Sequence, residues 1–175
     1  RKLKIGYTIE FFPEEGKYHW TGHRACNIKY SPQQEKEKGV VCPVCKQPLT
    51  VGVESRVMQL SHQTLTPNDL LFAQNKNGLT FITDKLKKRR PFVSIIPLQE
   101  VMIELEGESP VKGELAYQKA IQELGTEFDI LLHTPYDRIQ TFGGTRLRQA
   151  IEIIRTRQVY VDPGYDGVFG VVKIF

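Results

Sequence analysis

Two chelating pairs near the start of the chain constrain its fold more than any other feature. His23 and Cys26 are separated by two residues, and Cys42 and Cys45 repeat this spacing after an interval of fifteen residues. Zinc binds nitrogen and sulfur ligands in a tetrahedron, and two such short turns bring four ligands together at little entropic cost. The pattern predicts one structural zinc ion in a two-knuckle arrangement of the zinc-ribbon kind.

Two other interpretations of these residues stay open. A free or redox-active C-x-x-C pair would lie in a βαβ context, and the residues around Cys42 and Cys45 show no such pattern. His19 is a rival fourth ligand, although it lies in a strand-like Tyr-His-Trp segment and its spacing fits a knuckle less well than that of His23. The chain has three cysteines in all, which disfavours a disulfide framework.

Residue patterns divide the chain into three parts. Residues 1–60 have a β-rich composition with turns, interrupted by a short helical insert that Ser31 caps and Gly39 ends. Residues 61–96 show no sustained period, which predicts a linker or long loop. Residues 97–175 have helical signals and a hairpin signal at the end. We therefore expect an α+β chain: a small zinc-ribbon-like β module, then a helical region closed by a C-terminal β-hairpin.

Start and stop signals place the helices of the last part. One helix is expected between Pro97 and Gly107, and a second between Ser109 and Gly125. A dense turn signal at 162–167 separates the two strands of the hairpin. The final helix has the clearest apolar face, formed by Leu147, Ala150, Ile151 and Ile154.

Basic residues are in slight excess, with 24 Lys and Arg against 20 Asp and Glu. A net charge of +4 is compatible with nucleic acid but does not identify it. Five basic residues fall within six positions, where a solvated loop is the alternative interpretation. The arginines of the last helix are further candidates for phosphate contacts, at positions 146, 148, 155 and 157. The predicted nucleic-acid contacts, basic or aromatic, are Lys85, Lys87, Lys88, Arg89, Arg90, Trp20 and Tyr165.

The sequence shows no membrane-spanning or secretory signal. No apolar stretch approaches the roughly 20 residues that a membrane span needs. No apolar segment follows the basic N-terminus either. We expect a soluble, cytoplasmic protein with no membrane partner. Because the chain begins with Arg1 and enters a strand-like segment at once, we also expect it to be a fragment of a longer protein.

Several phrases together resemble one known family. They are GYTIEFFPEEGKYH at 6–19, GHR at 22–24, CPVCKQPLTVGV at 42–53, GTEFDILL at 125–132 and PGYDGVFG at 163–170. In this order they are similar to the C-terminal portion of endonuclease Q and its relatives, and the match covers most of the chain. Lys46 stands where relatives usually have glycine, and residues 61–90 differ from what the family leads us to expect.

The resemblance implies a non-catalytic part of a metal-dependent DNA repair endonuclease. In that family an N-terminal polymerase-and-histidinol-phosphatase (PHP) domain binds the catalytic metals. The enzyme nicks DNA 5′ to deaminated or missing bases. The part that corresponds to this chain would be the zinc-binding and helical region, which would hold DNA and position the lesion. The implied partners are DNA with deaminated or abasic sites and a PHP domain in cis.

Two other functional classes remain. A zinc-ribbon module that contacts a protein and no nucleic acid is the main alternative, because zinc-ribbon folds occur both in nucleic-acid-binding and in protein-binding modules. A self-sufficient enzyme is the weakest alternative, since the residues contain no P-loop and no Ser-His-Asp order. We accordingly expect no catalytic residues in this chain, and one structural zinc ion as its cofactor.

Overall fold

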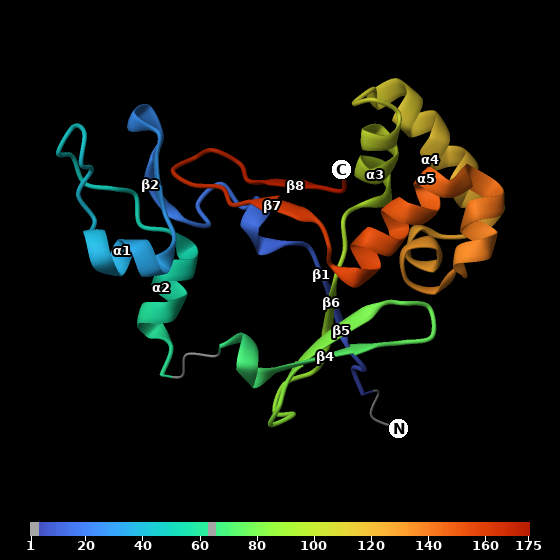
Figure 1. Cartoon of the computed structure of the whole chain (residues 1–175), viewed down its shortest axis with the longest axis horizontal. Coiled ribbons are helices and arrows are strands. Elements are labelled where there is room, and N and C mark those ends of the chain that lie inside the picture. The colour runs from blue at the N-terminus through green and yellow to red at the C-terminus, as the bar shows by residue number, and fades with distance from the viewer. Residues whose placement is uncertain (1–3, 63–65) are drawn as a thin grey trace. The chain divides into compact units, whose positions relative to one another are not determined.

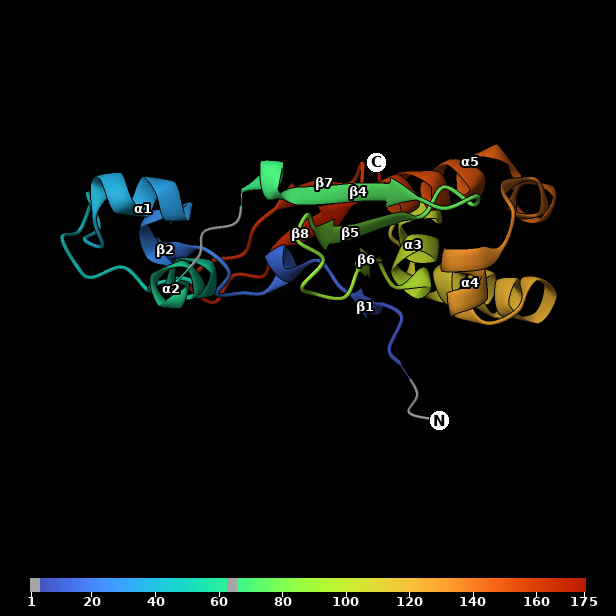
Figure 2. The same cartoon turned by 90° about the horizontal axis from the view of Figure 1, so that it is seen from below.

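The computed structural model describes residues 4–62 and 66–175, and these form two compact units. Unit 1 comprises Arg1–Phe11, Thr66–Val159 and Lys173–Phe175. Unit 2 comprises Phe12–Leu65 and Tyr160–Val172. Each unit is described by itself below, and Figures 1 and 2 show its elements.

Unit 2 is built from short strands and turns. Strand β2 (Thr21–His23) pairs antiparallel with β3 (Ile28–Tyr30), and the 3-10 turn η2 (Arg24–Cys26) joins them. A second 3-10 turn, η1 (Pro13–Glu15), precedes β2. The C-terminal strands β7 (Tyr160–Asp162) and β8 (Val171–Lys173) pair with each other, so the predicted hairpin is confirmed, with shorter strands than its sequence suggests.

Two helices complete unit 2. Helix α1 (Pro32–Lys38) begins with a reciprocal capping box between Ser31 and Gln34 and ends at Gly39, as the sequence predicts. Helix α2 (Val53–Leu60) occupies residues whose β-rich composition indicated a strand, so that expectation is wrong there. Both helices are tied to β2 by a buried polar network, in which the Thr21 hydroxyl bonds to Glu35 and accepts from the amide of Gly52 at 2.8 Å.

Unit 1 contains a mixed four-stranded sheet with the order β1-β6-β5-β4. Strand β1 (Thr8–Glu10) runs parallel to β6 (Phe92–Ser94), which pairs antiparallel with β5 (Thr80–Asp84). The 3-10 turn η3 (Pro67–Asp69) leads into β4 (Leu70–Gln74), which lies antiparallel beside β5 (Figures 1 and 2). The expected loop over 61–96 is therefore wrong between residues 70 and 94, where three strands form.

The helices of unit 1 begin and end close to the predicted signals. Helix α3 (Leu98–Leu105) is followed by α4 (Pro110–Leu124), then by the π-helical turn η4 (Asp129–His133) and α5 (Tyr136–Thr156). The apolar face predicted for the last helix is buried at all four positions, and it packs with α3, α4 and η4. Helix α5 is broken at Gly144, whose φ of 73° is not helical. The chain is thus α+β, with a small Cys/His-containing β module, a mixed sheet, a helical region and a C-terminal hairpin.

Arg155 lies in the interior of unit 1 with no exposed surface. Its guanidinium donates to the backbone carbonyls of Leu131, Asn77, Ile130 and Thr134 at 2.8–3.0 Å. A buried side chain cannot contact a phosphate, so the expectation that Arg155 binds DNA is wrong. The helical period of the sequence predicts on which side of the helix Arg155 lies, but it does not predict that this side chain is buried.

None of the described helices is long and apolar enough to cross a membrane.

Candidate metal centre

The four predicted ligands converge in unit 2. One ligand atom from each of His23, Cys26, Cys42 and Cys45 lies within 4.8 Å of the other three. The Sγ of Cys45 is 3.3 Å from Nδ1 of His23, and all three cysteines are free thiols. Three sulfurs and one imidazole nitrogen are a donor set that zinc takes in structural sites, so the residues present fit such an ion.

Two tight turns position these side chains. His23 ends β2 and Cys26 ends η2, where Asn27 follows in the left-handed conformation with a φ of 52°. In the second turn the Cys42 amide donates to the Gln47 carbonyl at 2.8 Å. Lys46 closes this turn with a φ of 64°, a conformation that glycine adopts at less cost. This geometry explains why a glycine is expected at that position.

The thiols differ in how readily they lose their protons. Burial opposes ionisation of Cys42, yet hydrogen bonds from the Cys45 amide and from His23 lower its pKa to about 6. Burial raises the pKa of Cys26 to about 11, and the neighbouring sulfurs of Cys45 and Cys42 contribute in the same direction. Crowded sulfurs cannot all become thiolates unless a cation compensates their charge, and a bound metal would supply that charge.

The turn at 163–170 braces the first knuckle. The Asp166 carboxylate accepts from the Arg24 amide at 2.7 Å and from the Thr50 hydroxyl at 2.5 Å. The hydrogen bond from Thr50, and to a smaller extent the one from Arg24, holds the pKa of Asp166 below its usual range. The Tyr165 ring packs on Gly22, where an added Cβ would lie 2.4 Å from the ring. Sequence reasoning missed this bracing role, although the turn signal itself was visible.

His19 takes no part in the cluster. Its Nε2 lies 3.3 Å from the Glu54 carboxylate, and that carboxylate also accepts from the indole nitrogen of Trp20 at 2.7 Å. His19, the alternative fourth ligand, therefore contacts Glu54 of helix α2 instead.

The predicted basic cluster is exposed in unit 1, in the turn between β5 and β6. Asp84, which is 7% exposed, shapes this turn by accepting from the amides of Lys88 and Arg89 at 3.1 and 2.9 Å. The hydrogen bond from Lys88, and to a smaller extent the one from Arg89, holds the pKa of Asp84 below its usual range. All five basic side chains of the cluster face solvent: Lys85, Lys87, Lys88, Arg89 and Arg90.

The two predicted aromatic contacts lie in unit 2 and are largely engaged there. Tyr165 is only 9% exposed, and its hydroxyl donates to Asn27 Oδ1 at 2.9 Å. Its ring therefore has little surface left for stacking on a base. Trp20 is partly buried, and the Lys29 ammonium lies 5.9 Å from its ring. The structure places these aromatics and the basic cluster in different units.

Comparison with known proteins gives one sequence relative and two solved structures. No protein-family model matches the chain. The uncharacterized protein MJ0043 of Methanocaldococcus jannaschii is 25% identical over 180 residues, which cover 98% of this chain and 20% of that protein. The crystal structure of the lesion-specific endonuclease PfuEndoQ from Pyrococcus furiosus matches with a TM-score of 0.74 and 24% identity, over 97% of this chain and 38% of that one.

The second structure is endonuclease Q in complex with a 27-mer duplex substrate that has an abasic lesion at the active site. It matches with a TM-score of 0.71 and 25% identity, over 98% of this chain and 39% of that one. The chain thus spans about two fifths of the solved structures and one fifth of the curated relative. Its structural neighbours are endonuclease Q chains, as the sequence resemblance predicts.

Proposed function

We propose that this chain is the zinc-binding and DNA-binding region of an endonuclease Q-like DNA repair nuclease. Its role would be to position a deaminated or abasic site for nicking on the 5′ side. The observation that carries the proposal is the likeness in fold over 98% of the chain to an endonuclease Q captured with an abasic duplex. Nicking itself would belong to a PHP-type domain in cis, so the residues of this chain would hold and orient DNA.

The metal centre would be structural and would contain one zinc ion. Four side chains supply four donors, which completes a tetrahedral shell and leaves no position for a substrate or an activated water. The ion would fix the two turns and, through the first knuckle, the Asp166 brace. Bound metal contributes directly to folding free energy in small modules of this kind.

Phosphate contacts would come from the exposed basic turn between β5 and β6. The turn presents Lys85, Lys87, Lys88, Arg89 and Arg90 to solvent, and Asp84 holds its backbone in place. Cations of this kind neutralise phosphates and release counterions, which gives an affinity that falls as salt rises.

Stacking contacts would come from Tyr18 and Phe169, which are 44% and 71% exposed. The Lys17 ammonium lies 5.7 Å from the first ring and 5.6 Å from the second. Exposed aromatic rings beside a cation are the elements with which proteins hold single-stranded bases. These two rings replace the buried Tyr165 in the proposed contact set.

The test is binding of the whole chain to duplexes containing uracil, hypoxanthine or an abasic site, measured by fluorescence anisotropy at several salt concentrations. Changing Lys87 and Lys88 to Gln should reduce the slope of log affinity against log salt by about one for each phosphate that is no longer neutralised. Lys36→Gln, an exposed charge on α1, is the matched control and should leave the slope unchanged. Affinity that is absent, or independent of salt, would contradict the proposal.

A nuclease assay separates positioning from catalysis. We expect no cleavage of the same duplexes by this chain alone in Mg²⁺ or Mn²⁺. Specific nicking that survives purification, and disappears on substitution within the chain, would instead make the chain a self-sufficient enzyme.

One observation favours a second candidate function, a protein-interaction module. Val53, Val57 and Leu60 lie on one face of α2 and are 58%, 59% and 62% exposed. An apolar helix face in contact with water is typical of a surface that a protein partner covers. Val57→Lys should then abolish partner binding while DNA affinity stays unchanged, whereas a loss of DNA affinity would assign this face to the nucleic acid.

A further inference from the structure

Strand β4 lies at one edge of the sheet in unit 1 and lacks the features that protect such an edge (Figures 1 and 2). Within residues 4–62 and 66–175, β5 is the only strand that pairs with it. Natural edge strands are short, or contain a charge, a proline or a bulge, which prevents another strand from pairing with them. Strand β4 has five residues with no charge and no proline, and its register with β5 has no bulge. The other edge strand, β1, has only three residues and contains Glu10.

The backbone groups of alternate residues of β4 point away from β5. An antiparallel pair alternates between residues that exchange hydrogen bonds with the neighbouring strand and residues whose N–H and C=O groups point outward. The Asp69 carbonyl accepts from the Lys85 amide at 2.9 Å, and the Asn75 amide donates to the Leu79 carbonyl at 3.1 Å. The odd-numbered residues of β4 therefore bond to β5. The residues whose backbone groups point outward are Leu70, Phe72 and Gln74.

The side chains at this open edge are mainly apolar. Phe72 is 57% exposed and Leu71 is 37% exposed. Directly opposite residues of an antiparallel pair share a face, so Phe72 lies on the same face as Ile82, which is buried. An added strand with an apolar residue opposite Phe72 would continue this face. Its main-chain hydrogen bonds would supply affinity, as they do where peptides extend a sheet in other proteins.

Positive charges lie at both ends of the open edge. Lys76, which is exposed, follows the end of β4 by two residues. The exposed basic turn 85–90 follows Asp84, which is paired with the first residue of β4. Asp69, which precedes the strand, already accepts from the amide and the hydroxyl of Thr66. Acidic residues on both flanks of an added strand would therefore complement this edge.

A second copy of this chain fits the edge less well than a different protein. In an antiparallel pair of β4 strands, the beginning of one strand lies beside the end of the other. The basic turn of each copy would then lie close to Lys76 of the other copy. Like charges would meet at both ends of the pair, which disfavours self-association through this edge.

We propose that β4 binds an extended segment of a partner protein by strand addition. This segment has apolar residues at alternate positions and acidic residues on both flanks. It exchanges main-chain hydrogen bonds with the three outward-facing residues, packs an apolar side chain against Phe72, and places its flanks near Lys76 and the basic turn. The inference goes beyond the proposed function and does not rest on it. Because the basic turn is also the proposed phosphate contact, DNA and one acidic flank would compete for it.

The experiment uses a labelled peptide, Asp-Glu-Val-Thr-Val-Thr-Val-Glu-Asp, whose affinity for the whole chain is measured by fluorescence anisotropy. Phe72→Pro removes one outward N–H and no hydrogen bond to β5, and edge strands tolerate proline at such positions. Phe72→Ala loses the same ring but keeps the N–H. We expect Phe72→Pro to bind the peptide roughly fivefold to tenfold more weakly than Phe72→Ala, which corresponds to one main-chain hydrogen bond. Circular dichroism verifies that both variants are folded.

Methylation of the peptide amides tests the geometry of pairing. A valine opposite Phe72 points its own N–H and C=O groups toward β4, whereas the threonines beside it point theirs away. Methylation of the valine amides should therefore abolish binding, and methylation of the threonine amides should preserve it. Contact through side chains alone would make the two methylated peptides equivalent.

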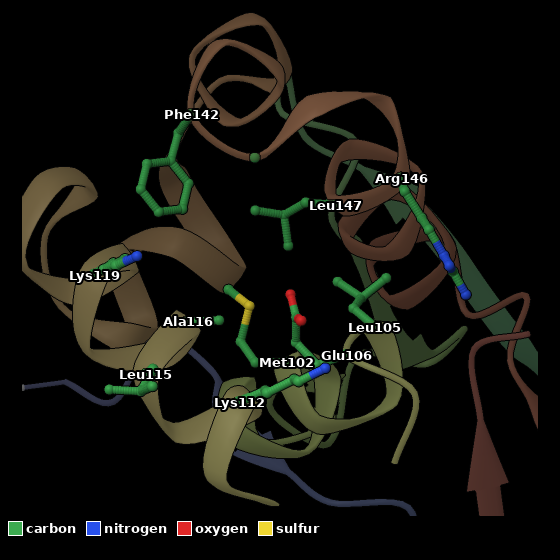
Figure 3. A pocket seen from close by; sticks show the side chains of 11 residues that line it. Met102, Leu105, Glu106, Lys112, Leu115, Ala116, Lys119, Phe142, Arg146 and Leu147 are labelled. Atoms are coloured by element: carbon green, nitrogen blue, oxygen red, sulfur yellow. The ribbon is translucent and has the colours of Figure 1, made fainter. Parts of the chain in front are cut away.

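Lys76→Gln tests the charged flanks and should weaken peptide binding by roughly twofold to fivefold, the range of one exposed ion pair. Another basic surface of unit 1 provides the control. The cavity among α3, α4 and α5 is bordered by Lys112, Lys119 and Arg146 (Figure 3). None of its lining residues belongs to β4, β5 or the basic turn. Lys112→Gln, at an exposed position, should therefore leave peptide affinity unchanged.

Several results would overturn the inference. They include absence of peptide binding, equal affinity of the Phe72→Pro and Phe72→Ala variants, and a loss of affinity in Lys112→Gln that Lys76→Gln does not show. Self-association in sedimentation experiments that Phe72→Pro abolishes would make the occupant a second copy. A loss of DNA affinity in Phe72→Pro would assign the edge to nucleic acid. Absence of all DNA affinity with peptide binding intact would refute the proposed function alone.

Discussion

Replacing Arg155 tests whether one buried guanidinium holds unit 1 together. The side chain reaches four carbonyls that belong to η4, to the residue after it and to the β4–β5 turn. Its guanidinium carbon also lies 4.9 Å from the centre of the Tyr136 ring. No carboxylate takes part in these contacts, so the charge is compensated by backbone dipoles and the aromatic face.

The expected cost follows from the acceptors that a substitution leaves behind. Each buried carbonyl without a partner costs about 1–3 kcal/mol, and relaxation or water entry reduces the sum over four. Loss of one member of a buried charged network typically costs about 3–5 kcal/mol. We therefore expect Arg155→Met, which keeps the apolar volume, to lower the free energy of unfolding by about 3–5 kcal/mol. Arg155→Lys keeps the charge and up to three donors, so it should lose about 2 kcal/mol.

The assay is urea unfolding followed by circular dichroism, with hydrogen exchange of the Asp129–His133 amides as a local readout. Protection of these amides should fall more than that of α4 if the guanidinium anchors η4. A loss below about 1 kcal/mol in Arg155→Met, or equal losses in the two variants, would refute the reasoning. The first result would mean that the carbonyls find other partners, and the second that volume rather than hydrogen bonding decides.

Three further predictions concern the metal centre and the basic turn. Cys42→Ser should abolish stoichiometric zinc binding, measured by elemental analysis, and a chelator should unfold residues 15–55 of the native chain; a folded, protected unit 2 after either change would contradict a structural metal. Lys46→Gly should raise the melting temperature modestly, which corresponds to about 0.5–1 kcal/mol of stability, because the left-handed conformation costs glycine less than lysine and this gain exceeds the loss from the entropy that glycine adds to the unfolded chain; a lower melting temperature would show that this entropy, or the contact of the Lys46 ammonium with the Pro43 carbonyl, dominates. The folded-state pKa of Asp84 is depressed, so its contribution is present above the ordinary carboxyl pKa and is lost as pH falls through the folded value. Stability should therefore drop less steeply in acid for Asp84→Asn than for the native chain in pH-dependent thermal unfolding.

Local signals predicted the helices because helix ends depend on neighbouring residues. The capping box at Ser31 and the glycines that end α1 and α4 act within a few positions, and the structure contains them. Helix α2 escaped this reasoning because Gly52 provides no side-chain cap and its valines suggest a strand. Val53, Val57 and Leu60 do recur with a helical period, but only within eight residues, which is too short a pattern to outweigh the strand preference of the valines.

The β4–β5 pair was missed for a different physical reason. Strand β5 does alternate, but two of its three buried positions are the polar residues Thr80 and Asp84. Asp84 is buried because its carboxylate caps the following turn, which no hydropathy pattern reports. Strand β4 lies at the edge of the sheet and exposes most of its residues, so Leu70–Gln74 showed no period.

Metal ligands and nucleic-acid contacts differ in how far a sequence can predict them, and the reason is the distance over which each is decided. His23 and Cys26 meet Cys42 and Cys45 because each pair is set by its own turn, and only one tertiary contact must then form. Whether an aromatic ring stacks on a base depends on whether the fold has already used its faces. Tyr165 lies in a turn, where exposure is the ordinary expectation, yet Gly22 offers a flat surface and Asn27 offers an acceptor, so the ring became part of the knuckle support. The same turn leaves Phe169 exposed four residues later, which makes it, rather than Tyr165, the residue at which mutation should separate DNA affinity from metal binding.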